Sequence, residues 1–88
     1  MAGAQSRRLF LFDEPTRGID VGAKSEIFAL IEELVERGAA VLLISSELSE
    51  IVHVCDRAYV MRAGRIGGEL GRAELSEENI LRLAMHGA

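Results

Sequence analysis

One short stretch constrains the fold of this chain more than any other. Four consecutive apolar residues, Leu9 to Phe12, run directly into the acidic residues Asp13 and Glu14 and then into Pro15. An uninterrupted apolar run bounded by turn-forming residues is typical of a short strand that is buried on both faces of a sheet. Proline cannot donate a hydrogen bond to a neighbouring strand, so we expect the strand to end before it, over about residues 8–13.

A long amphipathic segment and a second apolar run follow. We expect a helix over residues 21–37, with Asp20 capping its first N–H groups and Gly38 ending it. Its apolar stripe comprises Ile27, Leu30, Ile31, Leu34 and Val35. The run at residues 39–44 then predicts a second strand, parallel to the first, and an α/β fold. Both strands require cover on both faces, and one helix can cover only one of them.

The rest of the chain predicts a smaller helical and hairpin region. We expect a helix over residues 47–54 capped by Ser46, and hairpin strands at residues 58–62 and 65–70 joined by a two-residue turn. Gly67 and Gly68 should bulge or weaken the return strand. A last helix is expected over residues 77–86, capped by Ser76 and ended by Gly87, and residues 1–7 are expected to be a loose lead-in. The side chains expected to face inward are Leu48, Ile51, Val52 and Cys55, and the apolar residues of the last helix are Ile80, Leu81 and Ala84.

Composition excludes several classes of function. Eighty-eight residues allow one small domain at most. A net charge of −4, scattered basic residues and 5% aromatic residues argue against a nucleic-acid-binding surface. The single Cys55 cannot form an internal disulfide or a Cys-rich metal site, and it fits a reduced, cytoplasmic setting. The longest apolar run is too short to span a bilayer, so we expect no transmembrane segment.

The acidic pair at the end of the first strand has two interpretations. In open α/β sheets, ligands bind outside the carboxyl ends of the strands. Two carboxylates at such an edge could hold a hydrated Mg²⁺ and activate a water molecule for attack on a phosphate. The simpler alternative is that Asp13 and Glu14 form a solvated acidic turn. The pair alone does not decide between these interpretations.

Neighbouring motifs favour the first interpretation through a family resemblance. The run DEPTRGIDVGAK at residues 13–24 resembles the ATP-binding subunit of an ABC transporter, as do SSELSEI at residues 45–51 and DRAYVMRAGRI at residues 56–66. The similarity is to the second ATPase half of the tandem proteins that serve ribose-, galactose- and xylose-type sugar importers. It covers essentially the whole chain from Leu9 to about Leu83, with several motifs in the right order.

The resemblance implies a role for each matching residue. Asp13 corresponds to the Walker B aspartate, which holds Mg²⁺ through water, and Glu14 to the catalytic glutamate, which orients or deprotonates the attacking water. Asp20 belongs to the D-loop, which contacts the opposing ATPase domain across bound ATP, and it has a second candidate role as a helix cap. Ser46 stands where most ABC ATPases carry a γ-phosphate-sensing histidine. A serine hydroxyl is shorter and neutral, which leaves open how well such a site hydrolyses ATP.

Other motifs of the family do not occur in these 88 residues. No G-x-x-x-x-G-K-[ST] phosphate-binding loop (Walker A), Q-loop or LSGGQ-like signature segment is present. Residues 1–88 therefore resemble the C-terminal part of one ATPase domain, a partial P-loop NTPase fold. Mg²⁺ held by one or two carboxylates usually relies on substrate phosphates for its other ligands, so we expect this chain alone to bind Mg²⁺ and ATP weakly or not at all.

Three functional hypotheses remain. The first is the ATP-binding and ATP-hydrolysing subunit of a bacterial sugar ABC importer, present as a piece that is inactive alone. In the parent protein its partners would be permease subunits and a second ATPase domain, at the inner face of the membrane. The second is a non-enzymatic interaction fragment that associates through an open sheet edge. The third is an ABC ATPase outside transport, against which the sugar-type motif at residues 16–24 counts.

Overall fold

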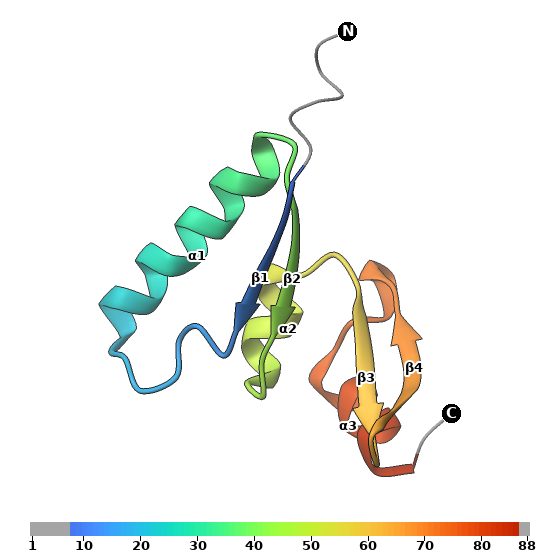
Figure 1. Cartoon of the computed structure of the whole chain (residues 1–88). Coiled ribbons are helices and arrows are strands. Elements are labelled where there is room, and N and C mark those ends of the chain that lie inside the picture. Colours follow the sequence, from blue (N-terminus) through green and yellow to red (C-terminus); the bar gives the residue numbers. More distant parts are fainter. Residues whose placement is uncertain (1–7, 87–88) are drawn as a thin grey trace, which may run out of the picture. The chain divides into compact units, whose positions relative to one another are not determined.

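The computed structural model describes residues 8–86 and has the expected α/β architecture (Figure 1). The chain divides into two compact units, the first ending at Ser46 and the second beginning at Glu47. The first unit contains a parallel pair of strands and a helix; the second contains an antiparallel hairpin and two helices. The expected lead-in at residues 1–7 and the expected helix end at Gly87 lie outside the described residues.

The first unit is the predicted strand–helix–strand arrangement. It consists of β1 (Leu9–Asp13), α1 (Val21–Glu36) and β2 (Ala40–Ile44), and α1 lies along β2. The strands are parallel, in a register that places Asp13 beside Ile44. The carboxyl ends of both strands therefore meet at one edge of this sheet, which is where Ser45 and Ser46 follow.

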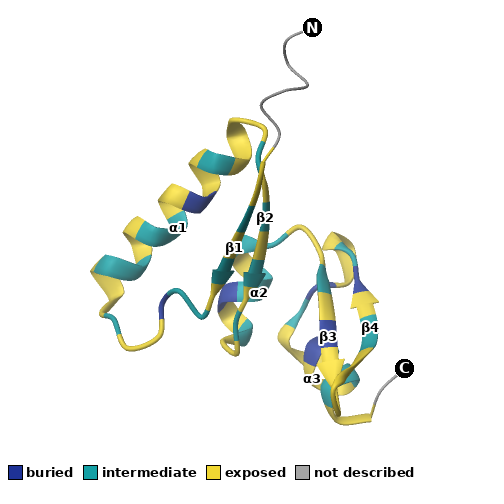
Figure 2. Ribbon diagram, in the orientation of Figure 1, coloured by how far each residue is buried: buried dark blue, intermediate teal, exposed yellow. Residues whose placement is uncertain are grey.

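The two faces of the strand pair differ in exposure. Along both strands exposed and half-buried residues alternate (Figure 2). On the exposed face lie Leu9, Leu11, Leu42 and Ile44, with 70%, 62%, 50% and 44% of their surface accessible. On the other face Phe10, Phe12, Val41 and Leu43 are half-buried. We expected that one helix could cover only one face of these apolar strands. Within this unit the other face is exposed, which agrees with that expectation.

Helix α1 packs through a narrower stripe than the sequence predicts. Ile31 is buried, with 4% of its surface exposed, and Ile27 and Leu34 are half-buried on the same side. The prediction for Leu30 and Val35 is wrong, since both are exposed. Leu30 and Val35 lie at the two margins of the apolar stripe. A sheet of two strands is too narrow to cover these margins as well as the centre of the stripe.

The second unit has its own apolar core. It comprises α2 (Leu48–Val54), β3 (Ala58–Arg62), β4 (Arg65–Leu70), a short 3-10 helix η2 (Arg72–Glu74) and α3 (Glu77–His86). Its buried residues are Val60, Leu70, Leu75 and Ile80, against which Leu48, Ile51, Val52, Ala58, Leu83 and Ala84 pack. The predicted inward positions on α2 are confirmed, and Cys55 is half-buried just after that helix.

The hairpin and the last helix confirm two predictions. The strands shift register between Val60 and Met61, because Gly67 is the extra residue of a bulge. The Ser76 hydroxyl accepts a hydrogen bond from the Asn79 N–H at 3.1 Å and so caps α3. Of the apolar residues on α3, Leu81 is exposed, whereas Leu83 packs against the core, close to Gly68.

The predicted cap of the helix after β2 is also wrong. α2 begins at Leu48, its N-cap position is Glu47, and no side chain hydrogen-bonds the first turn there. Ser46 precedes the cap position by one residue, and its side chain donates instead to Glu14 at the end of β1. Ser46 therefore hydrogen-bonds Glu14, which is distant in the sequence, and does not cap α2.

Candidate functional site

The candidate site lies at the carboxyl ends of β1 and β2, within the first unit. The parallel register brings Asp13, Glu14 and Ser46 to this one edge, although Ser46 is 32 positions beyond Glu14 in the sequence. Three of the four residues proposed from the sequence are therefore neighbours. The fourth, Asp20, lies at the start of α1 and contacts none of them by a hydrogen bond within residues 8–86.

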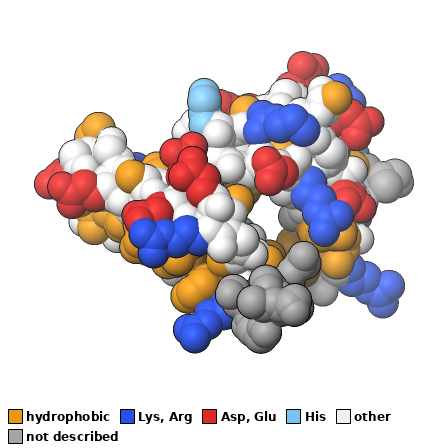
Figure 3. Space-filling view, turned by 90° about the horizontal axis from the view of Figure 1, so that it is seen from above, with side chains coloured by type: hydrophobic (Ala, Val, Ile, Leu, Met, Phe, Trp, Pro, Cys, Tyr) orange, Lys and Arg blue, Asp and Glu red, His pale blue; other side chains and the backbone are white. Residues whose placement is uncertain are grey.

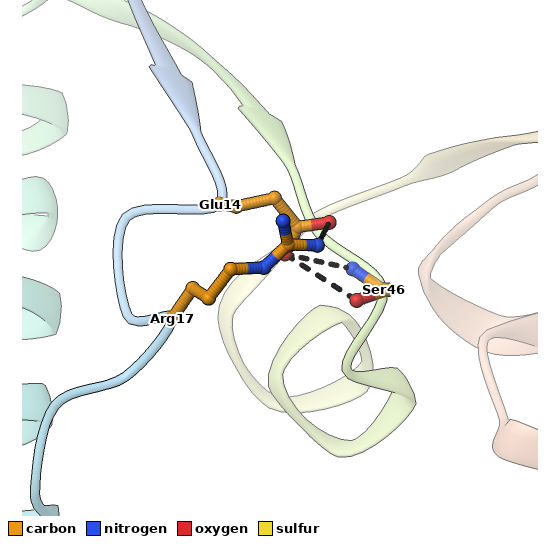
Figure 4. A network of polar contacts seen from close by, with 3 residues as sticks. All are labelled: Glu14, Arg17 and Ser46. Atoms are coloured by element: carbon orange, nitrogen blue, oxygen red, sulfur yellow. Dashed lines mark hydrogen bonds and ion pairs between the residues drawn. The ribbon is translucent and has the colours of Figure 1, made fainter.

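Glu14 is held by contacts to both its backbone and its side chain (Figure 4). Its N–H donates to the Ile44 carbonyl at 2.7 Å, which extends the strand pairing by one residue. Its carboxylate oxygen Oε1 accepts from the Ser46 N–H at 3.3 Å and from the Ser46 hydroxyl at 3.4 Å. The other oxygen, Oε2, pairs with the Arg17 guanidinium at 3.4 Å.

The backbone of Glu14 lies in the left-handed region, with φ of +50°. A side chain other than glycine is disfavoured there, and such residues concentrate at functional sites. The conformation turns the chain away from the strand, and the following turn is closed by hydrogen bonds from the Arg17 N–H to the Glu14 carbonyl and from the Ile19 N–H to the Thr16 carbonyl. Thr16 is buried within this turn.

Asp13 has different surroundings from its neighbour. It is the last residue of β1, it is exposed, and its carboxylate forms no hydrogen bond or ion pair with another described residue. Between residues 8 and 86, no group of three or more His, Cys, Asp and Glu side chains comes together as a metal site would require. The carboxylates of Asp13 and Glu14 are oxygen ligands of the kind that Mg²⁺ accepts, but they could supply only part of its coordination shell.

Asp20 caps α1 as predicted. Its Oδ1 accepts a hydrogen bond from the Ala23 N–H at 2.8 Å, and its own carbonyl accepts from the Lys24 N–H at 3.0 Å. The structure thus establishes one of its two candidate roles, and contact with another ATPase domain stays a prediction.

Sequence reasoning did not identify Arg17 as a neighbour of Glu14. The two residues are three positions apart and of opposite charge, a spacing that brings side chains together in a helical turn. That signal was present in the sequence, but it is weak without knowledge of the turn at residues 14–17.

No family model matches the chain, but comparison with individual proteins is informative. The chain is similar to the ATP-binding proteins of sugar ABC importers, as its motifs indicated. It is 60% identical over 78 residues to the arabinose import ATP-binding protein AraG of Ralstonia nicotianae. It is 53% identical over 81 residues to the ribose import ATP-binding protein RbsA of Yersinia pestis, and 59% identical over 81 residues to RbsA 2 of Rubrobacter xylanophilus.

These matches include nearly all of this chain but only a small part of each relative. They cover 89% to 92% of this chain but only 15% to 16% of the relatives. Such identity over nearly all of the chain supports the partial P-loop NTPase fold inferred from the motifs. In the part of the chain that the structure describes, no helix is long and apolar enough to cross a membrane.

Proposed function

We propose that this chain is the part of a sugar ABC importer's ATP-binding protein that carries its hydrolytic carboxylates. In this proposal Asp13 holds Mg²⁺ through water, and Glu14 orients or deprotonates the water that attacks ATP. Ser46 faces the γ-phosphate, and Asp20 lies at the contact with a second ATPase domain. The observation that carries the proposal is the fixed Glu14 carboxylate at the shared carboxyl end of β1 and β2.

Residues 1–88 then correspond to the region of one ATPase domain from the Walker B strand through the switch region to its C-terminal part. The whole protein would work with permease subunits and a second ATPase domain at the cytoplasmic face of the membrane. The relatives named above are described as arabinose and ribose import proteins, which supports a sugar as the cargo.

The residues present fit Mg²⁺ only when phosphates complete its shell. Mg²⁺ commonly binds one or two protein carboxylates together with substrate phosphates and water. The 88 residues contain no lysine-bearing phosphate loop, so nothing in them would cradle those phosphates. We therefore infer that this chain alone binds Mg-ATP weakly or not at all.

Two experiments test this function. Calorimetric titration of Mg-ATP into the 88-residue chain should show no saturable binding at micromolar concentrations, and tight binding would contradict the inferred inactivity. In a chimera, this chain's residues replace the matching 78-residue segment of the Ralstonia nicotianae arabinose protein. The chimera should hydrolyse ATP. Glu14→Gln should abolish turnover while retaining Mg-ATP binding, because it removes the base and keeps the shape of the side chain.

Glu33→Gln provides the matched control in the chimera. It neutralises a carboxylate that also pairs with an arginine, Arg37, but lies on the outer surface of α1. Its turnover should equal that of the unmodified chimera. Turnover that survives Glu14→Gln would remove Glu14 from the catalytic role.

The exposed face of the strand pair favours a second candidate function. Within the described residues each of β1 and β2 pairs with one strand only, and four large apolar side chains lie open beside them. Such a surface favours association through the sheet edge, so the chain could act as an interaction fragment. Light scattering at high concentration should then detect dimers or larger species, and a monomer under those conditions would exclude this candidate. An ABC ATPase outside transport is less well supported, since the relatives named above are import proteins.

A further inference from the structure

Arg17 makes a contact that neither the family motifs nor the comparisons assign. It lies three residues after Glu14, and its guanidinium pairs with Glu14 Oε2 at 3.4 Å (Figure 4). The Arg17 side chain is 72% exposed, whereas that of Glu14 is only 21% exposed. The Arg17 side chain therefore lies on the solvent side of the Glu14 carboxylate. Ser46, at the end of β2, contacts the same carboxylate through its N–H and hydroxyl.

The two oxygens of the Glu14 carboxylate are held differently. An ionised carboxylate offers about four acceptor positions, two on each oxygen. On Oε1 both positions are used, by the N–H and the hydroxyl of Ser46. Oε2 faces the Arg17 guanidinium in an ion pair at 3.4 Å. Oε2 is therefore the oxygen from which Glu14 can accept a proton or orient a water molecule.

Arg17 is itself held close to this position. Its N–H donates to the Glu14 carbonyl at 3.2 Å, which closes the turn that begins at the left-handed Glu14 backbone. Carboxylate and guanidinium therefore project from the two ends of one tight turn. Without the guanidinium, Oε1 would still be bound by Ser46, but Oε2 would have no charged partner and the carboxylate could rotate more freely.

We propose that Arg17 is a positioning residue, whose guanidinium restricts the rotation of the Glu14 carboxylate so that Oε2 faces the reacting water. This inference rests on the proposed hydrolytic role of Glu14. An exposed ion pair contributes little to folding stability, so the effect of Arg17 should be seen in the orientation of the carboxylate rather than in the stability of the fold.

The contact itself is tested by NMR on the isotope-labelled 88-residue chain. Because the Ser46 N–H donates to Glu14, its resonance reports how firmly the carboxylate is held. Arg17→Ala should move that resonance upfield, part of the way toward its position in Glu14→Gln, and should lower the midpoint of thermal unfolding by no more than Arg37→Ala does. Arg17→Lys should move it less, because a cation is retained. The matched control is Arg37→Ala, which removes the ion pair with Glu33 at 2.7 Å and should leave the Ser46 resonance in place.

The catalytic consequence is tested in the chimera with the Ralstonia nicotianae protein. Arg17→Ala should lower kcat by up to about fivefold with KM for Mg-ATP unchanged, which is the size of effect that an exposed ion pair can have. A Ser46 resonance that Arg17→Ala leaves in place, or a rise in KM alone, would overturn the positioning role. Turnover retained by Glu14→Gln would overturn the proposed function instead, and the NMR result would still decide whether Arg17 orients Glu14.

Discussion

Among residues 8–86, two residues other than glycine have left-handed backbones, and comparing them separates backbone strain from side-chain function. Glu14 has φ of +50° at the candidate site, and Ala63 has φ of +52° in the hairpin turn. The left-handed conformation costs a residue with a Cβ about 1–2 kcal/mol. Glycine avoids that cost but loses ~0.5–1 kcal/mol more chain entropy on folding. Ala63→Gly should therefore stabilise the second unit by up to about 1.5 kcal/mol.

The same substitution at Glu14 should not stabilise the first unit. Its backbone gain is similar, but Glu14→Gly also removes an exposed ion pair with Arg17, worth ~0.2–1 kcal/mol. It removes two long hydrogen bonds from Ser46 as well, each worth about 0.5 kcal/mol at the low end of the usual range. The net change should lie between about zero and 2 kcal/mol of destabilisation. Glu14→Ala keeps the strain and loses the contacts, so it should cost more than Glu14→Gly.

The assay must measure each unit separately, because the chain divides into two compact units. Native-state hydrogen exchange meets this need, with the amides of β1 and β2 reporting on Glu14 variants and those of β3 and β4 on Ala63→Gly. Equal losses of stability for Glu14→Gly and Glu14→Ala would refute the assignment of strain to Glu14. A destabilising Ala63→Gly would refute the reasoning for both positions.

Three further predictions concern single side chains. Asp20→Ala should destabilise the first unit by about 0.5–2 kcal/mol by hydrogen exchange, and Asp20→Asn by less, because asparagine also caps helices. Ile31→Ala should cost about 2–4 kcal/mol and Leu30→Ala under about 1.5 kcal/mol in the same assay, since only Ile31 is buried. Burial raises the pKa of the Cys55 thiol, with Asp56 adding to the shift and Arg72 opposing it, so alkylation at neutral pH should be slower than for an exposed cysteine. A raised pKa favours the protonated folded form, so stability should fall as the pH rises above about 8.5, and Cys55→Ala should lose that pH dependence.

Local patterns were sufficient to predict the elements of this fold. The two apolar runs, the helical stripe between them and the glycines of the hairpin each act over a few residues, and the corresponding strands, helix and bulge are confirmed. Inward positions at the margins of a helix were harder to predict. Leu81 and Leu83 are equally apolar, and only the hairpin on which α3 packs distinguishes them, because Gly68 leaves room for the Leu83 side chain.

Interactions between distant residues explain the other differences. Ser46 was expected to cap the next helix, but the parallel pairing of β1 and β2 places the Glu14 carboxylate within its reach. Arg72 was given no role, yet its guanidinium donates to the carbonyls of Val52 and Cys55 at 2.7 and 2.6 Å, near the end of α2. A cation near the last carbonyls stabilises a helix, but here the arginine lies 17 and 20 positions away, beyond the range of any local pattern.

The surface of the molecule shows why charge alone was a weak guide to the site. The face drawn in Figure 3 carries acidic and basic side chains side by side, with hydrophobic groups between them. Glu14 forms an ion pair with Arg17, and other arginines form comparable pairs with Glu33, Glu69 and Glu78. What distinguishes Glu14 is the second set of donors from Ser46 and a left-handed backbone, neither of which a charge pattern records.

The adjacent carboxylates at the end of β1 are made different by the backbone between them. Asp13 continues the strand and is exposed, and its carboxylate forms no hydrogen bond or ion pair with another residue between 8 and 86. Glu14 leaves the strand through its left-handed conformation, and its carboxylate contacts Ser46 and Arg17. Two carboxylates in different environments can serve two purposes. An exposed, solvated Asp13 suits a metal ion bound through water, whereas a Glu14 held on both oxygens suits a base that must point in one direction. The strain at Glu14 is thus the structural basis for dividing the two proposed roles between neighbours in sequence.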